Sequence, residues 1–64
     1  MNKFAVGQIW QATIGGALRR LLVESVKDDG WKADFRFIDN DETACDIVRS
    51  QLSPDWKLIG VKDV

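Results

Sequence analysis

Residues 28–42, DDGWKADFRFIDNDE, hold the clearest structural element of the sequence with a turn on each side. Apolar residues at positions 31, 33, 35 and 37 alternate with charged residues at 32, 34 and 36. This period of two predicts a strand over Trp31–Asp39 with one buried face, and it places Trp31 in the core. Asp28-Asp29-Gly30 before the strand and the polar run 39–42 after it predict tight reversals of the chain.

The segments before this strand are rich in β-branched and aromatic residues. Phe4–Ile14, FAVGQIWQATI, predicts a strand with an irregular entry at Gly7, and Gly15-Gly16 closes it. The next segment, 17–26 (ALRRLLVESV), fits two structures. Its leucines recur at helical spacing, which slightly favours a helix, whereas Leu21 and Val23 followed by a bulge fit a strand.

The segments after residue 42 are shorter. Thr43–Val48 fits a short strand or the start of a helix that runs to Leu52. In the first case Arg49–Leu52 forms a single helical turn. Residues 53–55, Ser-Pro-Asp, predict a turn, and Trp56–Val61 predicts the last strand.

Two architectures remain. The first is an all-β, five-stranded small barrel with one short helical turn near 49–52. The second is an α+β arrangement, β-α-β-α-β, with helices near 17–27 and 42–52. The order of turns favours the barrel.

Two stretches resemble Src-homology-3-type small barrels, a group that includes Tudor-like and KOW-like domains. They are VGQIW at 6–10 and SQLSPDWKLI at 50–59, and they are similar to the opening and closing segments of small bacterial barrels of uncharacterised role. The resemblance implies a peptide-binding groove between the first loop and the helical turn, here near Trp10, Gly15, Gly16 and Pro54. The sequence departs from the peptide-binding pattern of that group because it has no Tyr.

Length and composition limit the chemistry. The chain has 64 residues, which is enough for a single domain over 1–64. It has no His and one Cys, which excludes an imidazole base, a Cys-His nucleophile, an internal disulfide and a thiolate zinc site. We therefore expect no catalytic residues, no metal and no cofactor, and we expect Cys45 to be a small buried apolar residue.

Three tryptophans are the candidate contact residues for a protein partner: Trp10, Trp31 and Trp56. Together with the balanced charge, they predict a non-catalytic protein-interaction or adaptor module that can self-associate. The identity of the protein partner is not predicted. A small domain often gains stability by forming a homo-oligomer.

Two other functions are weighed against this one. A nucleic-acid-binding regulator would use Arg19, Arg20 and Arg36, but a net charge of -1 disfavours contact with phosphate backbones. Pairing of Arg36 with an acidic cross-strand neighbour is the simpler interpretation. An enzyme built at an oligomer interface is the third alternative, because a chain this short can hardly enclose a cleft alone.

No apolar run approaches the roughly 20 residues of a membrane span, so no membrane partner is expected. The start of the sequence lacks the apolar stretch of a signal peptide, and a lone thiol suits a reducing compartment. Both features predict a cytoplasmic protein.

Overall fold

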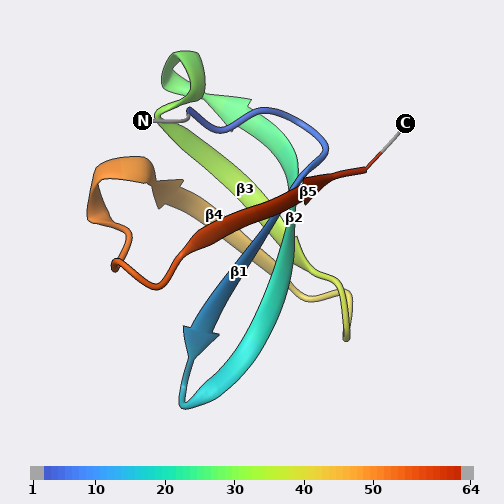
Figure 1. Cartoon of the computed structure of the whole chain (residues 1–64). Helices are drawn as coiled ribbons and strands as arrows, with labels where there is room; N and C mark the ends of the chain where they lie inside the picture. Colours follow the sequence, from blue (N-terminus) through green and yellow to red (C-terminus); the bar gives the residue numbers. More distant parts are fainter. Residues whose placement is uncertain (1–2, 63–64) are drawn as a thin grey trace.

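The computed structural model describes residues 3–62, which form five antiparallel strands and two short 3₁₀ turns (Figure 1). In chain order the elements are β1 (Gln8–Ile14), β2 (Ala17–Lys27), η1 (Asp28–Gly30), β3 (Lys32–Phe37), β4 (Thr43–Val48), η2 (Arg49–Gln51) and β5 (Lys57–Val61). The predicted all-β class and the helical turn after residue 48 are confirmed. The helices of the β-α-β-α-β alternative are wrong, because 17–27 is strand β2 and 42–52 holds strand β4 and the short 3₁₀ turn η2. No helix in residues 3–62 is long and apolar enough to cross a membrane.

The strands form one sheet in the order β4-β3-β2-β1-β5, so β4 and β5 are its edges. In the part of the chain that the structure describes, no pairing joins these two edges. The sheet is therefore open, and the expected closed barrel is not formed. Leu52 and Trp56, from the segment between η2 and β5, pack against the core instead.

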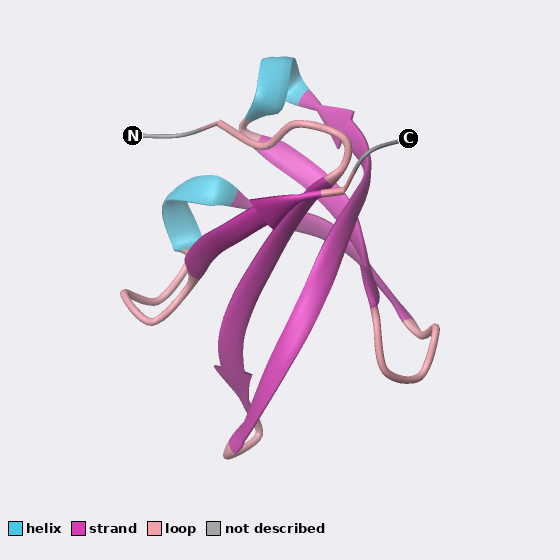
Figure 2. Cartoon of the chain, turned by 45° about the vertical axis from the view of Figure 1, so that its right-hand side comes forward, coloured by secondary structure: helices cyan, strands magenta, loops and turns pink. Residues whose placement is uncertain are grey.

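Three β-bulges curl the sheet. Glu24 is an extra residue on β2, residues 45–46 face one residue of β3, and Ile59 is an extra residue on β5. Each bulge bends its strand and increases the local twist, which gives the coiled outline in Figures 1 and 2. The bulge that follows Val23 agrees with the strand alternative for 17–26, and not with the helix that the periodicity of this segment slightly favoured.

The core lies on the concave face of this sheet. Its buried side chains are Phe4, Trp10, Ala12, Leu21, Val23, Ala33 and Phe35. Three edge-to-face ring contacts link the aromatic residues, with centroids 5.5 Å apart for Phe4 and Trp10, 5.0 Å for Phe4 and Phe35, and 5.7 Å for Phe35 and Trp56. Such contacts are favourable beyond the area that they bury.

Phe4 reaches the core from outside the strands. The sequence predicted that β1 begins at Phe4, but the strand begins at Gln8 and residues 3–7 are irregular. The amide of Phe4 donates to the carbonyl of Gly30 at 2.8 Å, which fixes this segment beside η1. Gly30 has φ +98°, and a Cβ there would lie 2.9 Å from Lys3 Cβ. Glycine at position 30 therefore allows the close approach that delivers Phe4 to the core.

Candidate functional site

Trp10 lies inside the core and is only 2% exposed. Its indole N–H donates to Gln8 Oε1 at 3.1 Å, and the Arg49 guanidinium lies 5.1 Å from its ring centroid. A partner cannot touch a side chain that is this deeply buried. Trp10 thus supports the sheet from within.

Trp31 lies at the surface, 42% exposed, and its prediction as a core residue is wrong. The strand begins one residue later, at Lys32, and Trp31 has helical backbone angles, φ −89° and ψ −8°. The alternation of the pleat therefore does not extend to it. The Lys3 ammonium lies 5.2 Å from its ring centroid.

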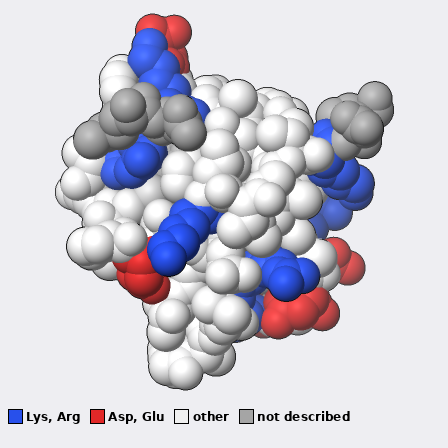
Figure 3. All heavy atoms as spheres, viewed as in Figure 1, with Lys and Arg blue, Asp and Glu red and all other residues white. Residues whose placement is uncertain are grey.

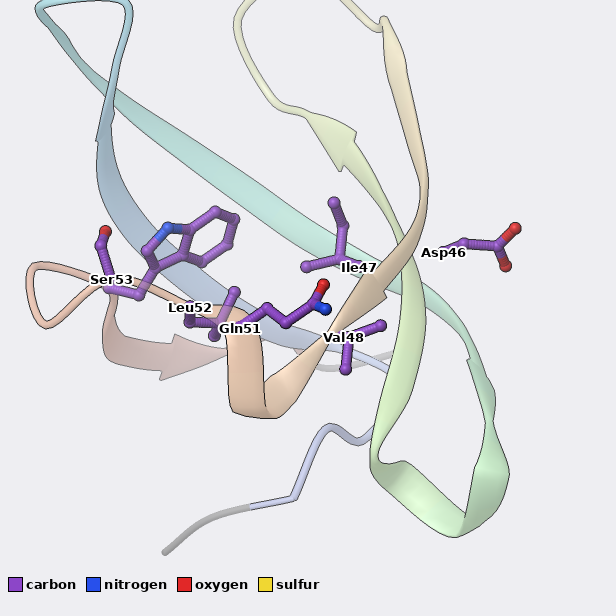
Figure 4. Close-up of a pocket in the computed structure, with 7 residues that line it drawn as sticks. Asp46, Ile47, Val48, Gln51, Leu52 and Ser53 are labelled. Atoms are coloured by element: carbon purple, nitrogen blue, oxygen red, sulfur yellow. The ribbon is translucent and has the colours of Figure 1, made fainter.

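Trp56 is half-buried and lines a groove of about 320 Å³ (Figure 4). The groove lies between β4, η2 and the segment that leads to β5. Its lining residues are Asp46, Ile47, Val48, Gln51, Leu52, Ser53 and Trp56. None of the residues near which the resemblance placed a groove lines this one: Trp10, Gly15, Gly16 and Pro54.

Two short turns shape the groove. In η2, the amide of Arg49 donates to the carbonyl of Trp31 at 2.8 Å, which ties the turn to the residue before β3. After Pro54, the carboxylate of Asp55 accepts the hydroxyl of Ser53 and the amide of Thr13. These hydrogen bonds hold the pKa of Asp55 below its usual range. The turn that carries Trp56 is thereby fastened to the end of β1.

The groove combines apolar walls with unused polar groups. Ile47, Leu52 and the Trp56 ring are apolar, whereas Gln51 adds an amide, and Figure 4 shows Asp46 pointing away from them. Among residues 3–62, no group accepts a hydrogen bond from the indole N–H of Trp56, unlike that of Trp10. Such a lining can hold an apolar side chain and donate to a backbone carbonyl beside it.

The structure does not bring the three candidate arginines together. Arg19 lies on the concave face, with its guanidinium 4.4 Å from the Phe37 ring centroid and 3.0 Å from Asp39 Oδ1. Arg20 is the next residue on β2 and therefore points to the opposite face. Arg36 forms a salt bridge with Glu24, the acidic cross-strand neighbour that the sequence indicated.

These salt bridges also shift pKa values. The guanidinium of Arg19 holds the pKa of Asp39 below its usual range, and Glu24 raises the pKa of Arg36. On the face shown in Figure 3, basic and acidic side chains are interspersed and much of the surface is uncharged. That face therefore shows no continuous basic patch.

A polar cluster that the sequence did not indicate joins two of the bulges. Asp34 accepts the amide of Asp46 at 2.9 Å, the hydroxyl of Ser25 at 2.9 Å and the ammonium of Lys27 at 3.3 Å. The Asp46 amide and the Ser25 hydroxyl lower the pKa of Asp34, and Asp46 and Asp34 raise the pKa of Lys27. Every polar contact of this cluster lies within the sheet, so its role is to hold β2, β3 and β4 together.

Cys45 is exposed, so its prediction as a buried apolar residue is wrong. It lies in the β4 bulge beside Asp46, whose φ of +56° interrupts the alternation of the strand. In the described residues, no group of three or more His, Cys, Asp or Glu is placed to hold a metal ion.

Sequence reasoning missed most of the groove, apart from Trp56. The available signal was Leu52, an apolar residue within the otherwise polar segment 49–55. Comparison with known proteins adds no further residue, because no protein-family model, curated protein or solved structure matches the chain.

Proposed function

We propose that this chain is a non-catalytic protein-interaction module that binds an extended peptide of a protein partner in the groove beside Trp56. The observation that carries the proposal is the half-buried Trp56 indole, which lines the groove, packs on Phe35 and has an N–H that no group of residues 3–62 accepts. Tryptophan residues of this kind are enriched among the side chains that contribute most to protein association.

The size of the groove defines what it can accept. A volume of about 320 Å³ is at the small end of ligand sites, which suits one or two side chains of a peptide rather than a large cofactor. An aliphatic side chain would pack on Leu52 and Trp56, while the indole N–H and the Gln51 amide would hydrogen-bond to the peptide backbone. We therefore expect the groove to select peptides that carry an aliphatic residue.

The strand order and the turn before the last strand support a finer assignment of the fold. A sheet of order β4-β3-β2-β1-β5, with η2 between β4 and β5, suits an open relative of the Src-homology-3-type domains. We propose this relationship on topology alone. The exposed thiol of Cys45 likewise supports a reducing, cytoplasmic location.

The other two functions have less support. A nucleic-acid-binding regulator would need its arginines free and on one face, but Arg19 and Arg36 are held by acidic neighbours and Arg20 lies on the opposite face from Arg19. An enzyme would need a nucleophile or an acid and base beside the groove. Among the lining residues, Ser53 donates its hydroxyl to Asp55, and the carboxylate of Asp46 points away from the groove and binds Lys27.

Selection from a displayed library of random peptides tests the proposal. The selected peptides should share an aliphatic residue, and Trp56→Phe should weaken their binding about tenfold, because phenylalanine keeps the packing on Phe35 but lacks the N–H. Val6→Lys is the matched control: Val6 is exposed and does not line the groove, so binding should be unchanged. Failure to select any peptide, or equal binding by Trp56→Phe, would contradict the proposal.

A further inference from the structure

A second cleft lies at the end of the sheet formed by the β1–β2 hairpin and the loop after β3. Its volume is about 330 Å³, and its lining residues are Leu18, Arg20, Ile38 and Asp39. Leu18 is 66% exposed and Ile38 is 48% exposed. Figures 1 and 2 both show the two loops extending in the same general direction, away from η1.

The register of the sheet groups these side chains on its outer face. Leu21 pairs with Phe37, and the amide of Ile38 donates to the carbonyl of Arg20 at 3.0 Å, so Ile38 lies across from Arg20. Leu18 precedes Arg20 by two residues and therefore points to the same side. Two exposed aliphatic side chains thus flank one guanidinium.

Charged side chains of both signs surround this apolar pair, and among residues 3–62 only Asp39 of them forms a salt bridge. Within residues 3–62, Arg20 forms no salt bridge, whereas Arg19 binds Asp39 and Arg36 binds Glu24. Asp41 and Glu42, in the loop that follows Ile38, form none with the described residues either. The patch therefore has the unpaired cation Arg20 beside a loop that carries two carboxylates. Glu42 has no ionic partner among the described residues, and Asp41 interacts with Arg36 through its charge without forming a salt bridge.

We propose that this face binds a second copy of the chain across a two-fold axis. Leu18 and Ile38 of the two copies pack against each other, and Arg20 of each copy faces the acidic loop of the other, around Asp41 and Glu42. A two-fold interface brings the same patch of each subunit together, so a patch that carries both charges complements itself. A nucleic acid or a purely acidic peptide would instead be repelled by the loop.

The small apolar area predicts a weak, concentration-dependent dimer, because interfaces well below about 1,200 Å² support only transient association. The net charge of -1 opposes this association little. The dimer surface is separate from the groove beside Trp56. Trp56→Phe should therefore leave dimerisation unchanged, and the two proposals can fail independently.

The interface is tested by two variants that each reverse one charge, with the dimer dissociation constant measured by sedimentation equilibrium. Arg20→Glu and Glu42→Lys should each raise the dimer dissociation constant at least about tenfold, since symmetry repeats each repulsive contact. An equimolar mixture of the two variants should dimerise as the unmodified chain does, because both contacts are then attractive. Circular dichroism spectra should be unchanged, because both side chains are exposed.

The control is Lys62→Glu, which makes the same change of charge at the opposite end of the sheet and should dimerise normally. A chain that remains monomeric up to about 1 mM would overturn the proposal, since that limit corresponds to less than about 4 kcal/mol of association free energy. The proposal would also be overturned if Arg20→Glu did not weaken dimerisation, or if the mixture of the two variants did not restore it.

Discussion

At the scale of single residues, three tryptophans have three different environments. Trp10 alternates with Ala12 on the concave face of β1 and is buried, whereas Trp31 lies one residue before its strand and is exposed. Trp56 stands between these cases, packed on Phe35 from one side. Local backbone geometry decides the difference, because side-chain alternation holds only where the chain is extended.

Exchanging each of the first two tryptophans for phenylalanine should separate these roles. Trp10→Phe should lower the free energy of unfolding by roughly 1–3 kcal/mol, since it removes buried volume and the hydrogen bond to Gln8. Trp31→Phe should change it by less than about 0.5 kcal/mol, as for other surface substitutions. Urea denaturation followed by circular dichroism measures both, and equal losses would contradict the assigned burial.

The hydrogen bonds of Asp34 predict how stability depends on pH. Its pKa is lowered in the folded chain, so the unfolded chain binds a proton more readily, and the stabilisation is lost as the pH falls through the folded pKa, below about pH 4. Asp34→Asn should be less stable than the unmodified chain at pH 7, and the difference should shrink near pH 2. Urea denaturation at the two pH values checks this, and a difference of the same size at both would argue against the role of Asp34.

At the scale of elements, alternation in 31–39 and the turn residues around it were enough to predict strands and their order along the chain. The segment 17–27 shows why periodicity alone was not enough to predict a strand. Leucines and valines at 18, 21, 22 and 26 fit a helix as well, and the bulge at Glu24 shifts the strand alternation by one residue. The β4 bulge has the same effect, which is why Cys45 is exposed. Such shifts depend on how a strand pairs with its neighbour, and this register could not be predicted from the sequence.

The position of Phe4 depends on the turn η1, and Gly30 tests this dependence. Gly30→Ala should lower the free energy of unfolding by roughly 1–3 kcal/mol, because its φ is positive and the new Cβ would meet Lys3 and the Phe4 carbonyl. Gly60→Ala is the control, since a Cβ there meets nothing within 4 Å, and its stability should be equal or higher. Thermal unfolding compares the two variants. An unchanged stability of Gly30→Ala would contradict the close approach of residues 3–4 to Gly30.

At the scale of the whole molecule, the two candidate surfaces have different origins in the sheet. The two edges fail to pair, which leaves the groove beside Trp56, and the loops at one end of the sheet form the apolar and charged cleft. Neither surface was predictable, because each combines residues that are far apart in the sequence, such as Ile47 with Trp56 or Leu18 with Ile38. Composition predicted only that a chain with no His would bind rather than catalyse.

The central claim, that the groove beside Trp56 is the binding site, is tested most directly by nuclear magnetic resonance. Titrating an isotope-labelled chain with a selected peptide should shift the amide signals of residues 46–53 and the indole N–H signal of Trp56. The signals of Trp31 and of the cleft around Arg20 should remain in place. Shifts confined to any other part of the chain, with the Trp56 indole unmoved, would contradict the account.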